Sequence, residues 1–205
     1  QQQVRNDLLT DFREALREQG LVVEVDETNG VLRLTEEAVR FSSGSAALID
    51  QARVNVERIA AALAAVLPRY TACAENNPVA GCGASGDTTV ETVFIEGHTD
   101  FIGGDDTNWP LSADRAVATY RAIDAAQPQL SDLRNRAGRQ IMSVSGYAAT
   151  RPITSDGSVD GLAQNRRIDL RFVMETNSRG RMQEILALTD AMAGEIESLR
   201  QMAEE

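Results

Sequence analysis

Apolar residues near the N-terminus recur every three or four positions, which is the spacing of a helix with one buried face. These residues are Leu8, Leu9, Phe12, Ala15 and Leu16. Gly20 is expected to end the helix. Two short apolar runs follow at 21–25 and 31–34, on either side of Asn29-Gly30, a pair typical of a hairpin turn. The first 38 residues therefore predict a helix followed by a β-hairpin.

A second helical pattern follows Asp50, a residue type that can cap the start of a helix. Its apolar positions are Val56, Ile59, Leu63, Val66 and Leu67. Pro68 is expected to end this helix, because its ring cannot continue the hydrogen-bonded ladder. Residues 69–89 are then rich in Gly, Asn, Ser and Thr, a composition that indicates an inserted loop.

Three further apolar runs, at 92–95, 141–145 and 168–173, predict strands. Between the first two, Ser112 is the expected N-cap of a helix that runs to Ala126. The order strand, helix, strand, helix, strand after the hairpin predicts an α/β (α+β) two-layer sandwich, with its helices on one face of a mixed sheet.

Alternation within the last strand predicts one buried face and one solvent face. The buried face holds Ile168, Leu170 and Phe172, and the solvent face holds Arg167, Asp169 and Arg171. Arg166 has the parity of the buried face. We therefore expect its side chain to reach under the loop that carries Asp100.

The C-terminal segment, 178–205, has the composition of a helix, with apolar and small residues at alternating spacings of three and four. These positions are Met182, Ile185, Thr189, Met192, Ile196, Leu199 and Ala203. Two interpretations stay open, docking on the chain's own domain and contact within a homodimer. The predicted organisation is a helix and hairpin at 1–38, a domain at 39–175 and a C-terminal helix at 176–205.

Charge and hydropathy exclude some classes of protein. The formal net charge is −11, so the surface repels phosphate backbones, and nucleic-acid binding is not expected. The longest apolar run, 59–67, has nine residues, whereas a membrane-spanning helix needs about 20. The chain opens on Gln1 without a secretory signal, and we interpret it as a mature or truncated form.

Cys73 and Cys82 both lie in the inserted loop. A metal site would need further ligands, and His98 is the only histidine of the sequence. If both were free thiols, the occurrence of two in one short loop would be a coincidence. A local disulfide is the favoured interpretation, and it would contribute about 2–3 kcal/mol, chiefly by restricting the unfolded loop. Since disulfides persist in oxidising compartments, this favours the periplasm.

The residue types with the clearest chemistry are a carboxylate and a guanidinium. Asp100 follows the strand at 92–95, and Arg115 is expected in the first turn of the next helix, where the helix dipole disfavours a cation. Asp100 offers a partner for an ammonium, and Arg115 a bidentate partner for a carboxylate. Together they are suited to a zwitterion, such as the free end of an amino acid. The alternative is a purely structural ion pair, which at an exposed site is worth about 0–1 kcal/mol.

An ordered set of short motifs resembles the OmpA-like peptidoglycan-binding domains of OmpA, Pal and MotB. The matching residues are Gly97-His98-Thr99-Asp100, Gly103, Asn108, Leu111-Ser112, Arg115-Ala116, Ser145-Gly146-Tyr147, Pro152 and Asn165-Arg166-Arg167-Ile168. The resemblance runs from about Val39 to Val173. It implies that Arg115 holds the carboxylate and Asp100 the amino group of diaminopimelate in the peptidoglycan stem peptide.

The same resemblance implies roles for three further residues. Arg166 resembles the arginine at the base of the family's pocket, and Asn108 and Thr99 match positions that line or shape it. Arg151 matches no motif and is interpreted as a solvated loop residue. The implied function is non-catalytic binding, with neither a metal nor another cofactor.

An enzyme is the remote alternative. His98 and Asp100 could suggest a metal-dependent hydrolase, with Asp105 and Asp106 nearby for a hard cation. A catalytic metal usually needs three protein ligands, however, and the sequence has no second histidine. His98 is instead expected to hydrogen-bond within its loop and set the shape of that loop.

The leading helix, hairpin, inserted loop and terminal helix are similar to MotB-type stator subunits, among them ZorB of the Zorya phage-defence system. This resemblance implies a periplasmic domain that anchors an ion-driven motor to the cell wall. A segment upstream of Gln1 would tether it to the inner membrane and to a stator partner, and the protein would be a homodimer. The alternative is an OmpA-like or Pal-like structural tether of the outer membrane.

Overall fold

A computed structural model of the chain describes residues 1–34, 38–39, 41–42, 44–72, 88–177, 182–183 and 185–194. The chain divides into two compact units, Gln1–Glu175 and Thr176–Glu205. In the second unit, the described residues from 182 to 194 are helical. Its large apolar side chains are each more than half exposed, namely Met182, Ile185, Leu186, Leu188 and Met192.

The first unit is built on a five-stranded mixed sheet. The strands are β1 (Glu24–Asp26), β2 (Val31–Leu34), β3 (Thr88–Gly97), β4 (Met142–Gly146) and β5 (Ile168–Thr176), in the order β1-β2-β5-β3-β4. The pairs β1–β2 and β2–β5 are antiparallel, whereas β3–β4 is parallel. The predicted hairpin and the predicted α+β fold class with a mixed sheet are both confirmed.

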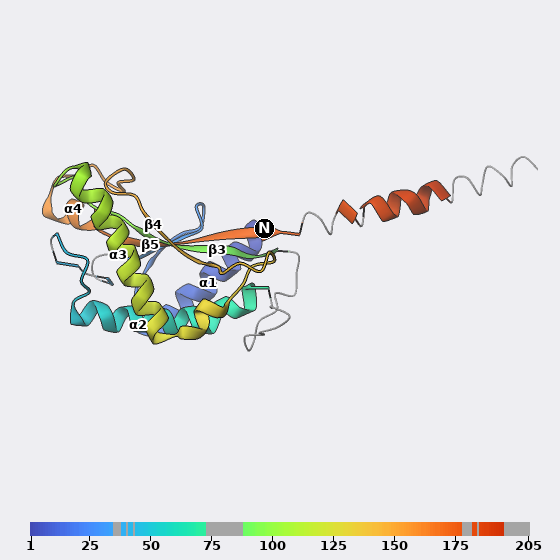
Figure 1. The fold of residues 1–205 in the computed structure, drawn as a ribbon, viewed down its shortest axis with the longest axis horizontal. Coiled ribbons are helices and arrows are strands. Elements are labelled where there is room, and N and C mark those ends of the chain that lie inside the picture. Colours follow the sequence, from blue (N-terminus) through green and yellow to red (C-terminus); the bar gives the residue numbers. More distant parts are fainter. Residues whose placement is uncertain are drawn as a thin grey trace, which may run out of the picture. The chain divides into compact units, whose positions relative to one another are not determined.

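Helices cover one face of this sheet. They are α1 (Gln2–Glu18), α2 (Asp50–Val66) and α3 (Asp105–Ala126), with 3-10 turns at Leu67–Tyr70 and Pro128–Asp132; the short α4 (Val159–Asn165) lies at one end of the sheet. Figure 1 shows α1 and α2 along the same side of the strands. The predicted apolar stripes are buried there, and the Phe12 ring stacks on Phe172 of β5 at 5.0 Å. Burial of such stripes against the sheet is the main stabilising term of the unit.

Several predicted boundaries are corrected. Asp50 is the first residue of α2 rather than its cap, and the residue before it, Ile49, provides no side-chain cap. The strand expected at 92–95 begins at Thr88, so β3 includes the last two residues of the predicted insertion. Cys73 and Cys82 lie outside the described residues, and their disulfide stays a prediction that thiol reactivity before and after reduction would check. Ile196, Leu199 and Ala203 of the C-terminal pattern also lie outside them.

The start of α3 was predicted wrongly. Gly104, with φ +72°, precedes the first helical residue, and Asp105 and Asp106 occupy the first turn, where the helix dipole favours carboxylates. Ser112 therefore lies inside the helix, two residues after Pro110. Arg115 lies ten residues after Asp105, and the dipole acts only on the first turn. The placement of Arg115 thus needs another explanation.

Ser112 instead marks the point where α3 crosses the ends of two strands. Its hydroxyl donates to the Trp109 carbonyl and accepts from the Ala148 backbone N–H, both at 3.0 Å. A Cβ on Gly97 would lie 2.0 Å from the Ser112 carbonyl oxygen, and one on Gly146 would lie 2.6 Å from the Ala113 nitrogen. Only glycine permits this approach. The crossing fixes the loop after β3 against the first half of α3.

The open face of β5, away from the helices, was also predicted wrongly. Ile168, Leu170 and Phe172 are buried as expected, but Arg167 and Asp169 are only 5% and 4% exposed. Asp169 is contacted by Arg33 of β2 and by His98, the residue after β3, and Arg167 donates to the Arg151 carbonyl in the loop after β4. The alternation of side chains along β5 correctly identified which residues share a face, but it did not reveal that Arg167 and Asp169 are buried on it.

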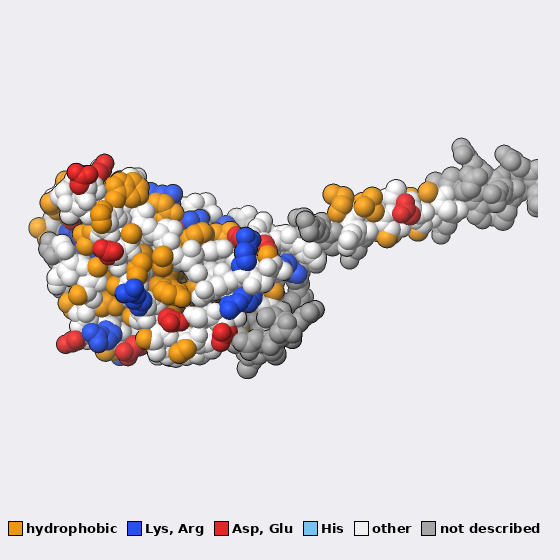
Figure 2. Space-filling model, viewed as in Figure 1, with side chains coloured by type: hydrophobic (Ala, Val, Ile, Leu, Met, Phe, Trp, Pro, Cys, Tyr) orange, Lys and Arg blue, Asp and Glu red, His pale blue; other side chains and the backbone are white. Residues whose placement is uncertain are grey.

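The surface of the first unit carries both signs of charge. Figure 2 shows acidic and basic side chains interspersed with apolar ones on the visible face. Within the part of the chain that the structure describes, no helix has the length and apolarity needed to cross a membrane.

Candidate ligand-binding pocket

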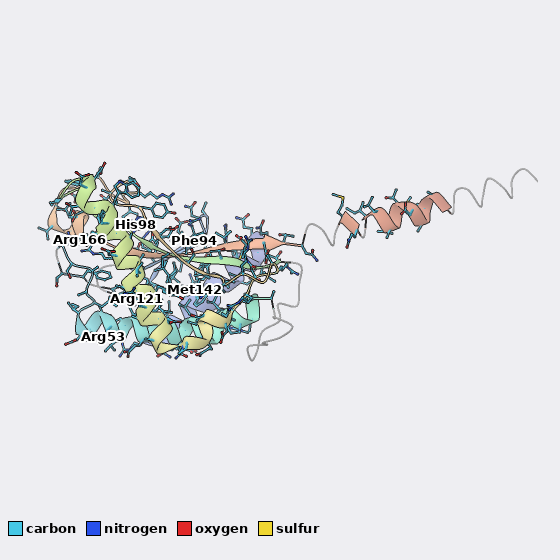
Figure 3. All side chains as sticks on the ribbon, viewed as in Figure 1. Arg53, Phe94, His98, Arg121, Met142 and Arg166 are labelled. Carbon is cyan, nitrogen blue, oxygen red and sulfur yellow. The ribbon has the colours of Figure 1, made fainter. Side chains whose placement is uncertain are left out.

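A pocket of about 250 Å³ lies where the loop after β3, the first half of α3 and the end of α4 meet. All five predicted ligand-binding residues line it: Thr99, Asp100, Asn108, Arg115 and Arg166. Figure 3 labels Arg166 at this end of the sheet. Gly44, Ile102, Gly103, Thr107 and Leu111 complete the lining. Residues that are far apart in the sequence are thus brought into one cavity.

Asp100 and Arg166 form the ionic centre of this pocket. Arg166 Nη1 donates to Asp100 Oδ2 at 2.8 Å, as expected from the parity of Arg166. Asp100 Oδ1 accepts from the Ile102 backbone N–H at 2.9 Å. The Asp100 side chain is 11% exposed and that of Arg166 27%, so both still reach the pocket surface. A carboxylate has about four acceptor positions, so Asp100 retains capacity for a further donor.

Asn108 shapes the loop around Asp100. Its amide nitrogen donates to the carbonyls of Asp100 and Ile102, each at 3.1 Å, which ties α3 to both ends of that turn. The Thr99 backbone N–H donates to the Ala148 carbonyl, while its hydroxyl is buried without a hydrogen-bond partner among the described residues. These two residues fix the position of the Asp100 carboxylate.

Arg115 enters the pocket from the third turn of α3 and is almost fully buried. Its Nε donates to the Ser45 carbonyl at 3.0 Å and its Nη2 to the Ser42 carbonyl at 3.2 Å. The guanidinium also lies 5.1 Å from the centroid of the Phe41 ring. Arg115 therefore connects α3 to the segment before α2, a structural role that the sequence did not reveal because its acceptors are backbone carbonyls.

The charge of the lining favours an anionic group. Among the lining residues that the structure describes, Arg115 and Arg166 contribute two guanidinium groups and Asp100 the only carboxylate. In a chain whose formal net charge is −11, this local excess of positive charge is an exception. A ligand with a carboxylate beside an ammonium matches the pair of arginines and the carboxylate together.

His98 does not belong to this pocket. It is buried on the open face of the sheet, where its ring stacks on Tyr147 with centroids 5.5 Å apart. Its Nε2 lies 3.3 Å from Asp169 Oδ2, an ion-pair distance without the alignment of a hydrogen bond. Burial lowers the pKa of His98, although Asp169 opposes this shift. The expectation that His98 hydrogen-bonds within its own loop was wrong, because β5 supplies its neighbour.

His98 and Asp100, two residues apart, line different cavities. The pairing required by the metal-dependent hydrolase hypothesis therefore does not occur in this geometry. Arg151 was interpreted as a solvated residue. It is exposed, but its guanidinium also lies 3.6 Å from the centroid of the Tyr147 ring.

Residues 83–166 match the OmpA family. The matched segment contains all five residues that were predicted to bind ligand. The peptidoglycan-binding protein ArfA of Mycobacterium tuberculosis is 38% identical over 80 residues, covering 38% of this chain and 21% of ArfA. The chain thus spans about a fifth of the length of the curated relatives it matches.

Solved structures give the same fold. A fragment of the periplasmic domain of Helicobacter pylori MotB is similar with a TM-score of 0.50 and 19% identity, covering 84% of this chain and 99% of the fragment. A MotB-like protein from Desulfovibrio vulgaris has a TM-score of 0.51 and 22% identity, covering 85% of this chain and 92% of that protein. At these identities the likeness establishes the fold alone.

Proposed function

We propose that this protein binds peptidoglycan without catalysis, through the pocket that contains Asp100, Arg115 and Arg166. The observation that carries the proposal is the convergence of one carboxylate and two guanidinium groups in a single cavity. The name of ArfA, a peptidoglycan-binding protein similar to this segment, supports the same ligand.

The zwitterionic end of diaminopimelate in the stem peptide is the proposed ligand group. Its ammonium would bind the Asp100 carboxylate, while its carboxylate would lie against Arg115 and Arg166. Charge-assisted hydrogen bonds of this kind are about twice as strong as neutral ones, and a planar guanidinium matches a carboxylate geometrically. Asn108 and Thr99 would act by holding the loop that carries Asp100.

Binding of purified protein to isolated sacculi tests this proposal. Co-sedimentation should be inhibited by a stem tripeptide that ends in diaminopimelate. The matched control is the same tripeptide ending in lysine, which keeps the side-chain ammonium but lacks the adjacent carboxylate. Equal inhibition by the two peptides would exclude the assignment of the arginines. Release of soluble muropeptides by the protein would exclude the non-catalytic function.

We further propose that the protein acts in the periplasm as the wall anchor of a MotB-type membrane stator, of the phage-defence type represented by ZorB. The motif resemblance described above supports this role, and an outer-membrane tether is the alternative. Cross-linking of the natural full-length protein in cells would distinguish them, because a stator subunit should be captured with an inner-membrane partner.

The homodimer belongs to the same proposal. The exposed apolar side chains of residues 182–194 are the surface available for pairing. Light scattering should show a dimer that is lost when Ile185 and Met192 are both changed to Asp. A monomer at all concentrations would remove the support that this segment gives to a paired stator.

A further inference from the structure

A second cavity, of about 380 Å³, lies on the open face of the sheet, away from the helices. In Figure 3, His98 and Phe94 are labelled on the side of the sheet away from α2. The cavity is lined by four arginines. They are Arg33 of β2, Arg151 of the loop after β4, Arg167 immediately before β5, and Arg171 of β5. None of the ligand-binding residues predicted from the sequence contributes to it.

Two carboxylates in this cavity already have close partners. Glu96 accepts from Arg171 Nε at 2.8 Å and from the Tyr147 hydroxyl at 3.1 Å. Asp169 accepts from Arg167 Nε at 3.1 and 3.2 Å, and His98 Nε2 lies 3.3 Å from it. Arg171 and Glu96 therefore form a closed pair, and the capacity of Asp169 is largely used.

Guanidinium groups remain with unused donors. The Arg167 side chain is 4% exposed, and its Nη1 has no hydrogen-bond partner in the described part of the chain. Arg33 Nε is also buried without one, and Arg33 reaches Glu24, Asp26 and Asp169 only at 3.5, 4.0 and 3.7 Å. A buried donor without an acceptor destabilises the fold, because it has lost its hydrogen bonds to water without replacement. Such donors around one cavity indicate a missing acceptor.

Arg151 is the most exposed of the four arginines in the described lining of the cavity. Its guanidinium stacks on the Tyr147 ring, and a stacked guanidinium keeps its N–H groups at its edge, where they can donate. The lining has four guanidinium groups against the three carboxylates of Asp26, Glu96 and Asp169. Burial lowers the pKa of His98, so its imidazole adds no charge at neutral pH. Among the described lining residues the guanidinium groups thus outnumber the carboxylates by one, and Glu24, outside the lining, offsets this difference at Arg33.

We infer that this cavity binds a small oxyanion, a carboxylate or a phosphate group, between Arg33, Arg151 and Arg167. The oxyanion supplies the acceptors that the buried arginine nitrogens lack. Forked guanidinium donors suit both anions, because each presents paired oxygens. This site is separate from the pocket that contains Asp100, Arg115 and Arg166, called the stem-peptide pocket below after its proposed ligand. It does not depend on the function proposed for that pocket.

His98 offers a specific reporter, because it is the only histidine and lines this cavity. Its imidazole proton resonances would be followed at pH 7.5 while inorganic phosphate or acetate replaces chloride at constant ionic strength. We expect a saturable shift with at least one of the two anions. Saturation by phosphate alone would assign a phosphate group, and saturation by acetate alone would assign a carboxylate.

Arg151→Gln should weaken that binding at least fivefold. Arg151 is exposed, so the variant is expected to fold, and circular dichroism would verify this. Arg139→Gln is the matched control, because it removes the same charge from a side chain that is 71% exposed and absent from the cavity lining. Linear shifts without saturation for both anions, or equal affinity in the wild type and Arg151→Gln, would overturn the proposal.

The fluorescence of Trp109, the only tryptophan, separates this site from the other one. Trp109 lies on α3 next to Asn108 of the stem-peptide pocket, so its emission should respond to the stem tripeptide. If the stem tripeptide leaves the Trp109 emission unchanged while an anion still shifts the His98 resonances saturably, only the peptidoglycan proposal is contradicted. The reverse result would contradict only the oxyanion site.

Discussion

The stem-peptide pocket and the cavity on the open face of the sheet are built from neighbouring residues of the same motifs. Asp100 and Arg166 line the stem-peptide pocket. His98, two residues before Asp100, and Arg167, the residue after Arg166, line the cavity on the open face. Both contain arginine–carboxylate pairs, but their carboxylates differ in burial and in the number of partners. In the pocket, Asp100 pairs with Arg166 at 2.8 Å and its side chain is 11% exposed, whereas on the open face the Asp169 side chain is 5% exposed and is shared by several groups.

This difference separates a pair arranged for binding from a cluster that also stabilises the sheet. A partly exposed pair can exchange solvent for a ligand at little cost to the fold. A buried cluster cannot lose one member without leaving the others unpaired. The comparison predicts that substitutions in the pocket change binding, while substitutions on the open face change stability first.

The largest expected effect is the loss of Asp169. Asp169→Ala would leave Arg33 and Arg167 without their shared carboxylate, and breaking a buried ion pair costs about 3–5 kcal/mol. Chemical denaturation should show this loss in the unfolding free energy. Glu24→Ala is the control, because Glu24 is 65% exposed and contacts Arg33 at 3.5 Å, and its removal should leave the unfolding free energy nearly unchanged. If the two substitutions lowered the unfolding free energy equally, the buried cluster around Asp169 would not be the stabilising element that the comparison requires.

The next largest effect is on binding. Asp100→Ala should weaken sacculus binding by about 2–4 kcal/mol, because it removes the carboxylate that would pair with the ligand ammonium. Co-sedimentation against protein concentration measures this loss, with Arg139→Ala as the surface control. If Asp100→Ala bound sacculi with wild-type affinity, the ligand would not bind in the pocket that contains Asp100.

Arg115 tests whether one residue serves both purposes. Arg115→Lys keeps the positive charge but loses the fork that reaches both Ser42 and Ser45. A hydrogen bond to a charged group is worth about 1.5–3 kcal/mol, and lysine can keep only one of the two, so a drop of about 1.5–3 kcal/mol in unfolding free energy is expected alongside weaker binding. A variant that loses binding without any loss of stability would show that the carbonyl contacts are incidental.

The sequence predicted the pocket better than the open face for a physical reason. Asp100, Asn108, Arg115 and Arg166 belong to short motifs whose order and spacing are themselves a signal. Burial of Arg167 and Asp169 depends instead on β2 and β3, which flank β5 in the sheet order. The alternation of one strand identifies which side chains share a face, but not what lies beside that face.

The start of α3 gives the same lesson at a smaller scale. Ser112 is a favoured N-cap residue type, and Pro110 is tolerated mainly near helix starts, so local preferences predicted a late start. The helix begins earlier because Gly104 and the two aspartates after it provide a better N-terminus. Ser112 is required for its contact with the strand ends, which local sequence does not show.

The smallest expected effect is the pH dependence contributed by His98. Burial lowers its pKa in the folded protein, so the folded state favours neutral imidazole. The unfolded chain binds a proton as the pH falls through about 6.5, the ordinary histidine value. His98 therefore stabilises the fold fully above that pH, and this contribution is lost as the pH falls toward the folded pKa. The slope for one proton is at most about 1.4 kcal/mol per pH unit.

Unfolding free energies of the wild type and His98→Asn, measured between pH 7.5 and about 5.5, would isolate this contribution, because the carboxylates are common to both proteins. The difference between them should shrink in favour of the variant as the pH falls. The lining of the stem-peptide pocket contains no histidine, so the corresponding change should be absent from sacculus binding. Parallel stability curves would show that His98 remains accessible to protons, and the open face would then be less enclosed than its burial indicates.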